Sequence, residues 1–340
     1  MELRILKLLG LGLALALVLL GLGIPPGLAG AGVTSNTQSD HDHLANPKNY
    51  RATYSVTITN ISARMDTLEI WIPRPVGWDS QKDVRIEEVT PSPTRSYSDP
   101  VHQNGIYYWK FRNKPGRGQS ITVSERFKFT AYDIIYDVDP ESIGRYDRNS
   151  QLYRTYTRSE RFIEANDSAI RAKALKIVGS ETNPYRKARL IYDWVIDHLR
   201  YQSIEGLGGA KFALERGYGE CGDYAALFCA LLRAVGVPAR PVVGYWAESG
   251  KPTHVWAEFY LPGYGWVPAD PERGDNSGEH GRDYYFAHLD GSKRLIFSKG
   301  FNIRLSSEHT ADLFQTFYWW YHGSSGHTRT DFNLIVEPID

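Results

Sequence analysis

Residues 218–238, Tyr-Gly-Glu-Cys-Gly-Asp-Tyr-Ala-Ala-Leu-Phe-Cys-Ala-Leu-Leu-Arg-Ala-Val-Gly-Val-Pro, contain the pattern that decides the fold. Glycines flank Cys221, and apolar residues then recur with helical spacing until Gly236 and Pro238. This pattern predicts a buried helix that begins at Cys221 and stops at the glycine. The unpaired N–H groups at a helix start favour the thiolate, which is the nucleophilic form of cysteine. Cys221 is therefore a candidate reactive thiol.

The second cysteine, Cys229, lies eight residues further along the predicted helix. A cysteine among apolar residues more often acts as a small, inert hydrophobic side chain, and we assign Cys229 to the core on that ground. Eight helical residues rise by roughly 12 Å, which exceeds the ~7 Å that a disulfide can bridge. We therefore expect two free thiols.

Length and charge restrict the class of protein. A chain of 340 residues predicts two folded domains behind an N-terminal targeting segment. The 39 Lys and Arg residues equal the 39 Asp and Glu residues, so the composition disfavours a nucleic-acid partner. Two cysteines are too few for a disulfide framework, so an exposed thiol outside the cell needs a reason such as catalysis.

Residues 1–31 have the layout of a secretory signal. A basic start precedes an uncharged apolar run over residues 8–24, and Ala29-Gly-Ala31 is the expected cleavage site. The alternative is an uncleaved anchor, which would make residues 8–24 the chain's contact with a membrane. Either alternative places the folded part outside the cytoplasm. Residues 32–48 are polar without periodicity and predict a linker, whose histidines we interpret as solvated.

Residues 49–136 contain short alternating strands. Examples are 54–59, 67–72, 105–111 and 120–129, separated by Gly, Pro, Asn and Asp. They predict an antiparallel β-sandwich, interpreted as a support or adhesion module because the stretch shows no catalytic constellation.

Residues 137–340 begin with helix signals and end with strands. Two amphipathic helices are expected near residues 167–179 and 184–199, and three strands at 239–246, 253–261 and 265–271. The alternation of the second strand places His254 and Trp256 on one face.

Cys221, His254 and Asp270 follow one another in the order nucleophile, base and orienting acid. A histidine from a neighbouring strand can hold the thiolate as an ion pair, and an aspartate on the next strand can orient the imidazole ring. Spacing alone is weak evidence, because a chain with ten histidines offers such triplets by chance.

Three local motifs strengthen this hypothesis. Gly219-Glu-Cys-Gly-Asp-Tyr-Ala, His254-Val-Trp-Ala-Glu-Phe-Tyr and Gly265-Trp-Val-Pro-Ala-Asp-Pro together resemble the signature of the transglutaminase-like superfamily. The resemblance covers residues 137–340, and residues 50–135 look like the β-rich domain that precedes this core in some prokaryotic members. It implies an α+β fold with a papain-like core, helices packed on an antiparallel sheet, and Cys221, His254 and Asp270 as the catalytic triad.

The resemblance implies an enzyme that attacks amide bonds of peptides or proteins through a thioester. We expect protease-like hydrolysis slightly more than cross-linking, because water is abundant outside the cell. The alternatives are a protein-glutamine acyltransferase, which cross-links or deamidates, and a non-catalytic binding or adhesion scaffold.

Other segments predict no cofactor or metal. The calcium sites of animal transglutaminases match no motif here, and the acidic stretch 270–279 is interpreted as a solvated loop. The aromatic block 317–322 is interpreted as packing in preference to a substrate-binding wall. The remaining tail, with strands near 295–298, 301–305 and 331–338, is expected to complete the catalytic domain.

Overall fold

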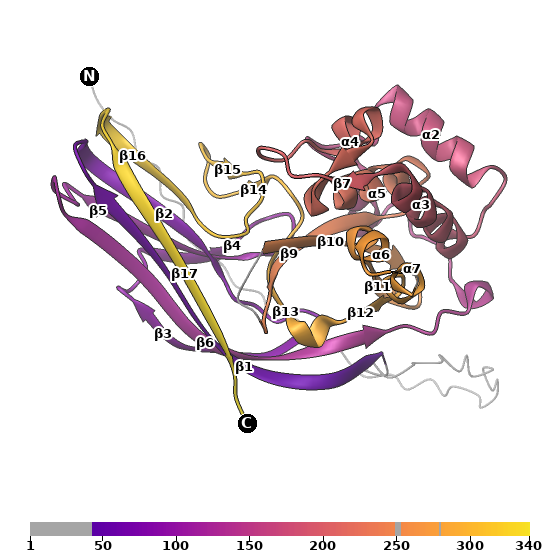
Figure 1. Cartoon of the computed structure of the whole chain (residues 1–340), viewed down its shortest axis with the longest axis horizontal. Helices are drawn as coiled ribbons and strands as arrows, with labels where there is room; N and C mark the ends of the chain where they lie inside the picture. The colour runs from indigo at the N-terminus through magenta and orange to yellow at the C-terminus, as the bar shows by residue number, and fades with distance from the viewer. Residues whose placement is uncertain (1–42, 249–252, 279) are drawn as a thin grey trace, which may run out of the picture. The chain divides into compact units, whose positions relative to one another are not determined.

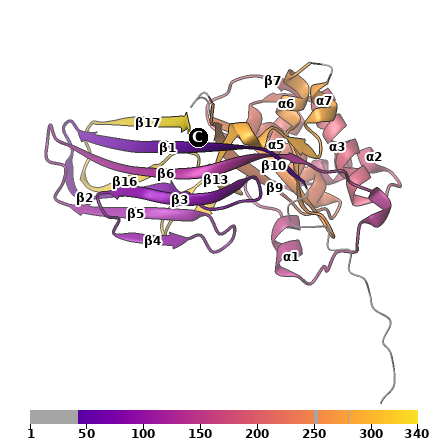
Figure 2. The ribbon, with the colours of Figure 1, turned by 90° about the horizontal axis from the view of Figure 1, so that it is seen from below.

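The alternating residues of the N-terminal half form two antiparallel sheets that enclose a common core. The structure is a computed structural model, and it describes residues 43–248, 253–278 and 280–340. The strands of this half are β1 (Leu44–Asn60), β2 (Arg64–Arg74), β3 (Gln81–Thr90), β4 (Arg95–Ser98), β5 (Gly105–Arg112) and β6 (Ser120–Ile135). One sheet has β1, β3 and β6, and the other has β2, β4 and β5. Figure 2 shows the two layers.

Two strands from the C-terminal end of the chain complete this sandwich. β16 (Tyr318–Ser324) pairs with β2, and β17 (Thr328–Pro338) pairs with β1 over the whole length from Tyr50 to Asn60. The expectation that the tail belongs to the catalytic part is wrong for these strands. Without β17, one edge of β1 would expose unpaired backbone groups, so the pairing closes an otherwise open edge.

The expected linker is also shorter than residues 32–48. β1 begins at Leu44, because the segment 44–48 pairs with the far end of β6. The predictions for residues 1–31, including the apolar run 8–24, lie outside the described residues. Within the described ranges, no helix is both long enough and apolar enough to span a membrane.

The C-terminal half is a group of helices packed on an antiparallel sheet. The helices are α1 (Gln151–Thr157), α2 (Ser168–Val178), α3 (Pro184–His198), α4 (Ala210–Arg216), α5 (Cys221–Ala234), α6 (Pro271–Asn276) and α7 (Gly281–Tyr284), with short 3-10 turns η1 (Pro140–Ser142) and η2 (Gly291–Lys293). The sheet has the order β11 (Gly265–Ala269), β10 (Thr253–Leu261), β9 (Ala239–Trp246) and β13 (Arg294–Lys299). Short pairs complete the half: β7 (Arg200–Tyr201) with β8 (Tyr218–Gly219), β12 (His288–Leu289) with β6, and β14 (Ile303–Arg304) with β15 (Thr310–Ala311).

The helix boundaries follow from their capping residues. Asp167 accepts hydrogen bonds from the first backbone N–H groups of α2, and Gly179 follows its last residue. Asn183 caps α3 in the same way, with Pro184 at the first helical position. Both helices therefore occur where the sequence predicts them. Leu190 of α3 is 42% exposed and therefore lies away from the buried face of this helix.

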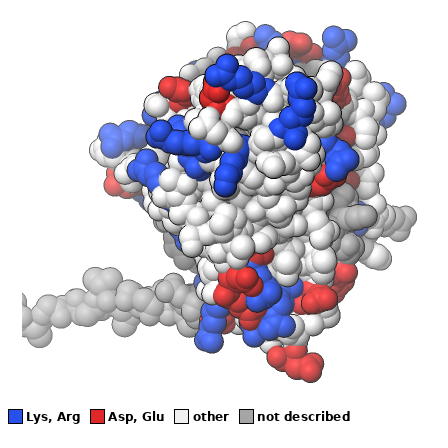
Figure 3. Space-filling view, turned by 90° about the vertical axis from the view of Figure 1, so that its left-hand side faces the viewer, with Lys and Arg blue, Asp and Glu red and all other residues white. Residues whose placement is uncertain are grey.

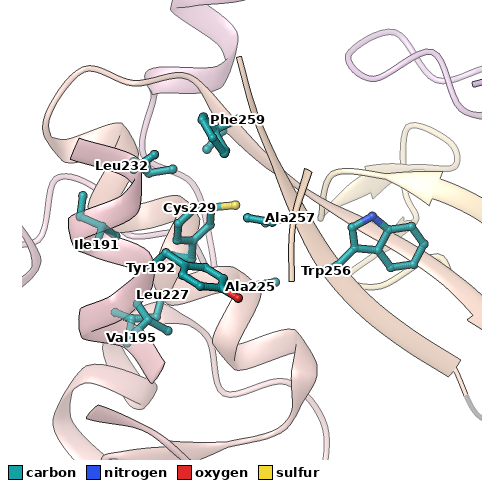
Figure 4. Packing of buried hydrophobic residues seen from close by; sticks show 14 of the residues in the cluster. Ile191, Tyr192, Val195, Ala225, Leu227, Cys229, Leu232, Trp256, Ala257 and Phe259 are labelled. Atoms are coloured by element: carbon teal, nitrogen blue, oxygen red, sulfur yellow. The ribbon is translucent and has the colours of Figure 1, made fainter. Parts of the chain in front are cut away.

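Helix α5 is the centre of this half. Its residues from Gly222 to Arg233 are all buried, and it packs against the face of β10 that carries Ala257 and Phe259. Figure 4 shows Cys229 next to Ala257, with Trp256 pointing to the opposite side of β10. The strand alternation thus separates the core residues of β10 from the face that carries His254.

The sandwich and the four-stranded sheet β11-β10-β9-β13 share apolar packing. Tyr245 of β9 and Leu295 and Phe297 of β13 belong to the same buried cluster as the inner residues of β1, β2 and β6. Figure 1 accordingly shows β9 and β13 lying between the sandwich strands and the helices. The sandwich is therefore in direct contact with the sheet that carries the candidate site.

The end of the sandwich that lies on the left in Figure 1 carries mixed charge. Figure 3 shows mostly basic side chains, with some acidic ones, over the upper part of this end, and acidic and basic side chains together over the lower part. On β16, Trp319 and Tyr321 stack on each other and pack against the sandwich core, as the packing interpretation predicts. The side chain between them, Trp320, is 47% exposed.

Candidate active site

Cys221 is the first residue of α5 and lines a cleft of about 670 Å³. The backbone before it is held by Asp223, whose carboxylate accepts N–H groups of Glu220 (2.9 Å), Gly208 (2.9 Å) and Gly209 (2.8 Å). A Cβ at position 219 would lie 2.5 Å from the Asp223 side chain, so glycine is required there. The Gly-Glu-Cys-Gly-Asp sequence thus fixes the thiol at the helix start.

His254 lies behind the thiol and contacts both other predicted site residues. Its Nε2 atom lies 2.7 Å from Oδ2 of Asp270, and Cys221 is close enough to contribute to the raised pKa of the same imidazole. Since Nε2 is engaged by Asp270, Nδ1 is the nitrogen that remains for the thiol. His254 is 5% exposed and Asp270 is fully buried.

The charges of the site stabilise an ion pair. Burial alone would lower the pKa of His254, but the charge and hydrogen bond of Asp270, together with Cys221, raise it to about 10. Burial would likewise raise the pKa of Asp270, yet the charges and hydrogen bonds of His254 and Arg294 hold it well below its usual range. At neutral pH the imidazole is protonated and the carboxylate is ionised.

Two tryptophans and an arginine enclose this pair. Trp246 and Trp256 stack on the His254 ring, with ring centroids 5.5 and 6.1 Å away. The Arg294 guanidinium lies over the same two indoles and donates to Oδ2 of Asp270 at 2.7 Å.

Glu272 is buried beside the imidazole, which corrects the expectation of a solvated loop over residues 270–279. Asp270 caps α6 by accepting the N–H of Arg273 at 3.1 Å, and Pro271 begins the helix. The resulting turn brings Oε2 of Glu272 to 3.8 Å from Nδ1 of His254. Burial raises the pKa of Glu272, although the charge of His254 opposes this shift.

The described residues include one group whose spacing could suit a metal ion. Ligand atoms of His254, Asp270 and Glu272 lie within 4.8 Å of one another. However, Nε2 of His254 forms a hydrogen bond with Oδ2 of Asp270, and the same oxygen accepts a second hydrogen bond from the Arg294 guanidinium. A bound cation would displace these bonds and face a buried positive charge, so we assign no metal to this group.

The lining of the cleft is acidic near the thiol. Among the described lining residues Arg161 is the one cation, and it is paired with Asp312 at 2.9 Å. Glu205 and Glu220 line the same cleft, as does the phenol ring of Tyr201. Because Arg161 is paired with Asp312, the charge that Glu205 and Glu220 add to the cleft lining is not balanced by a cation of that lining.

The structure brings together all three residues that the sequence analysis singled out, while their catalytic role stays a prediction. Cys229 is fully buried, and burial raises the pKa of its thiol to about 12, as expected for an inert side chain. Sequence reasoning missed Arg294, Glu272 and Tyr201. Only Glu272 had a local signal, since it follows Asp270-Pro directly.

The architecture defines a class of protein. A cysteine at the start of a central helix, a histidine on β10 and an acid directly after the adjacent strand β11 form the α+β core of the papain type. Residues 171–271 match the family model of the transglutaminase-like superfamily. The chain therefore carries a transglutaminase-like core.

Known proteins resemble parts of this chain. An uncharacterised protein of Haemophilus influenzae is 37% identical over 123 residues, which are 28% of this chain and 33% of that protein. A protein-glutamine gamma-glutamyltransferase of Pseudomonas aeruginosa is 34% identical over 75 residues, 19% of this chain and 11% of that protein. This chain thus spans a third or less of the length of these relatives.

A solved structure shares the fold over most of the chain. It is a protein from Cytophaga hutchinsonii described as a candidate cysteine protease, with a TM-score of 0.61 and 17% sequence identity. The match covers 87% of this chain and 92% of that one. The sandwich and the papain-type core therefore occur together in another protein.

Proposed function

We propose that this chain is a thiol-dependent enzyme that attacks amide bonds of peptides or proteins, with Cys221, His254 and Asp270 as its catalytic residues. The observation that carries the proposal is a helix-start thiol that lines a cleft and lies near an imidazole held by a buried carboxylate. An adhesion scaffold would not need a protonated imidazole beside an accessible thiol.

The proposed reaction has two steps. The Cys221 thiolate attacks the amide carbon, and the C–N bond then breaks while His254 gives its proton to the departing amine. Water or a second amine then attacks the thioester carbon while His254 takes the proton of the attacking group. The C–S bond breaks, which releases the acid or the new amide and returns the Cys221 thiolate. The N–H of Cys221, unpaired at a helix start, is a candidate donor to the oxyanion.

Hydrolysis is the first candidate outcome, because Cys221 is partly exposed to solvent in an open cleft. Acyl transfer to an amine is the second. The carboxylates of Glu205 and Glu220 in the cleft, together with that of Glu272 beside His254, would attract a protonated amine. The similarity to a protein-glutamine gamma-glutamyltransferase supports this second candidate. The signal-like pattern of residues 1–31 supports action outside the cytoplasm.

Alkylation with iodoacetamide tests the thiol site. Mass spectrometry should locate the label on Cys221 at pH 5 to 6, where an ordinary thiol with a pKa of about 8.5 reacts slowly. The His254→Ala variant should lose this reactivity at low pH, whereas the Cys229→Ala variant should keep it. Equal labelling of wild type and His254→Ala would refute the proposed ion pair.

A second assay separates the two outcomes. Casein incubated with the full chain and a fluorescent primary amine should yield fragments if hydrolysis dominates, and labelled intact casein if acyl transfer dominates. Loss of both products in Cys221→Ala attributes the reaction to the thiol.

A further inference from the structure

Arg294 is a buried cation and the first residue of β13, the strand that pairs with β9. Its side chain is 1% exposed, and its Cζ atom lies over two indole rings, 4.5 Å from the ring centroid of Trp246 and 4.8 Å from that of Trp256. A buried guanidinium requires acceptors for its N–H groups. Two buried carboxylates supply them.

The two carboxylates lie at opposite ends of the guanidinium. Nη1 donates to Oδ2 of Asp270 at 2.7 Å. Nε and Nη2 both donate to Oδ1 of Asp290, at 2.9 and 2.6 Å. Because Oδ2 of Asp270 also binds His254, the four side chains form a row of alternating charge: imidazolium, carboxylate, guanidinium and carboxylate.

We propose that Arg294 is a positioning residue of the active site, which orients the Asp270 carboxylate and compensates its charge when His254 is neutral. This inference rests on the proposed function for its kinetic consequence. Its electrostatic part concerns His254 and Asp270 directly and can be measured without any substrate.

The need for compensation arises in the thioester state. After His254 has given its proton to the departing amine, the buried Asp270 has no imidazolium partner, and an isolated buried carboxylate would recapture a proton. Arg294 keeps Asp270 ionised at that stage. Its positive charge also weakens the hold of Asp270 on the imidazole proton, so His254 can stay neutral and accept a proton from the attacking water.

The sandwich holds the segment that carries Arg294. The amide of Gln81 exchanges two hydrogen bonds with the backbone of Ile296, at 2.8 and 3.2 Å. Tyr50 of β1 donates to the carbonyl of Ser292 at 3.0 Å, and Asp133 of β6 accepts the N–H of the same residue at 3.0 Å. The predicted support module thus contacts the loop that fixes Arg294.

Several charged or titratable groups face the His254–Asp270 pair from the surrounding elements. They are Cys221 of α5, Tyr192 of α3, Glu272 and Arg273 of α6, Asp290 just before η2, and Arg294 of β13. Of these, Arg294 contacts Asp270 directly and Asp290 contacts Arg294. Removing one or the other should therefore change the proton affinity of His254 in opposite directions.

The test is the titration of His254 by NMR in the full chain with labelled histidines. All variants are made in a Cys221→Ala background, which removes the thiol and so mimics a site without thiolate. The NMR signal of His254 is identified by its absence from the His254→Ala variant. Arg294→Met should raise the His254 titration midpoint by about one pH unit or more. Asp290→Asn should lower it, since the asparagine oxygen can still accept from Arg294 but carries no charge.

Lys299→Met is the matched control. Lys299 is on the same strand, is equally buried, and pairs with Glu258 of β10 at 2.8 Å. Its replacement should leave the His254 midpoint unchanged. A purely structural role of Arg294 predicts shifts of the same sign in Arg294→Met and Asp290→Asn, and that result would overturn the proposal. If Arg294→Met fails to fold, an unchanged or raised midpoint in Asp290→Asn is sufficient to overturn it.

A kinetic readout links the result to the proposed function. With p-nitrophenyl acetate as an acylating probe, Arg294→Met in the otherwise native chain should slow thioester hydrolysis at pH 7 roughly tenfold more than it slows acylation. The deficit should shrink at higher pH. If the His254 midpoint shifts in opposite directions in the two variants but Cys221 is unreactive, the electrostatic role of Arg294 is supported and the proposed enzyme is rejected. If Cys221 is reactive but the midpoint does not shift, the proposed enzyme is supported and the role of Arg294 is rejected.

Discussion

Oε2 of Glu272 lies 3.8 Å from Nδ1 of His254, on the opposite side of the ring from Asp270. A carboxylate at this position competes with the thiolate for the imidazolium, and it offers a negative charge to an incoming ammonium group. Its second oxygen accepts from Asn276 at 3.0 Å, which holds the side chain in place. Glu272 is therefore suited to influence which group attacks the thioester.

Glu272→Gln should shift the reaction from amine acceptors towards water. Loss of the negative charge removes an attraction on the order of 1 kcal/mol for a protonated amine, so incorporation of the fluorescent amine should fall severalfold while casein hydrolysis is retained. Iodoacetamide should also label Cys221 faster at pH 5 to 6. Glu308→Gln, on an exposed turn, is the control, and an unchanged ratio of the two products would contradict this role.

Tyr201→Phe should lower kcat about a hundredfold with little change in KM, if the phenol donates to the oxyanion. Tyr201 lines the cleft, and burial together with the negative charges of Cys221, Glu220 and Glu272 raises its pKa, so it stays protonated as a donor. Steady-state kinetics on the peptide substrate measure both constants. Tyr284→Phe, at a comparably exposed tyrosine, should be silent. A change in KM alone would assign Tyr201 to substrate binding.

Local patterns in the sequence placed the three candidate catalytic residues at the ends of their elements, and the resemblance of three motifs to the transglutaminase-like superfamily singled them out. The start of α5 at Cys221 follows from glycines and helical periodicity, and the position of His254 follows from strand alternation. Asp270 precedes a proline that ends its strand. Each of these signals involves neighbouring residues, so none depends on knowing which strands pair.

The residues that sequence reasoning missed depend on long-range pairing. Arg294 reaches Asp270 because β13 pairs with β9, which places Arg294 opposite Trp246 in the register. β17 joins β1 through pairs such as Tyr50 with Pro338, at opposite ends of the described chain. Alternation predicts that a segment is a strand but contains no information about its partner.

His254 and Asp270 should make stability depend on pH at both ends of the range. The pKa of His254 is raised to about 10, so its stabilising contribution is complete below its ordinary value of about 6.5 and is lost as the pH rises through about 10. The pKa of Asp270 is lowered, so its contribution is present above about 3.9 and is lost in stronger acid.

His254→Gln should therefore lower the free energy of unfolding by on the order of 3 kcal/mol at pH 6, and by much less at pH 10. Urea titrations at pH 5, 6, 8 and 10 measure the difference. His322→Gln, at an exposed position, should change stability by at most about 0.5 kcal/mol. A deficit that stays constant from pH 6 to 10 would show that packing, and not the ion pair, accounts for the loss.

Glu125 of β6 provides the last prediction, because it is an acid buried in the sandwich core. It is 1% exposed, and neither carboxylate oxygen has a hydrogen-bond partner among the described residues. Burial raises its pKa well above the usual value, although the charge of Arg74 opposes the shift. A raised carboxyl pKa destabilises the folded state progressively as the pH rises above the unfolded value of about 4.3.

Glu125→Met should consequently stabilise the fold at pH 8 by on the order of 2 kcal/mol. Glu125→Gln separates two contributions: it removes the dependence on pH but keeps a buried polar group, so its stability should fall between those of the wild type and Glu125→Met at pH 8. At pH 4 wild type and Glu125→Gln should unfold at nearly the same urea concentration. If Glu125→Met is less stable than the wild type at pH 8, the carboxylate and Arg74 form a stabilising pair, and the charge of Glu125 is then part of what holds the sandwich together.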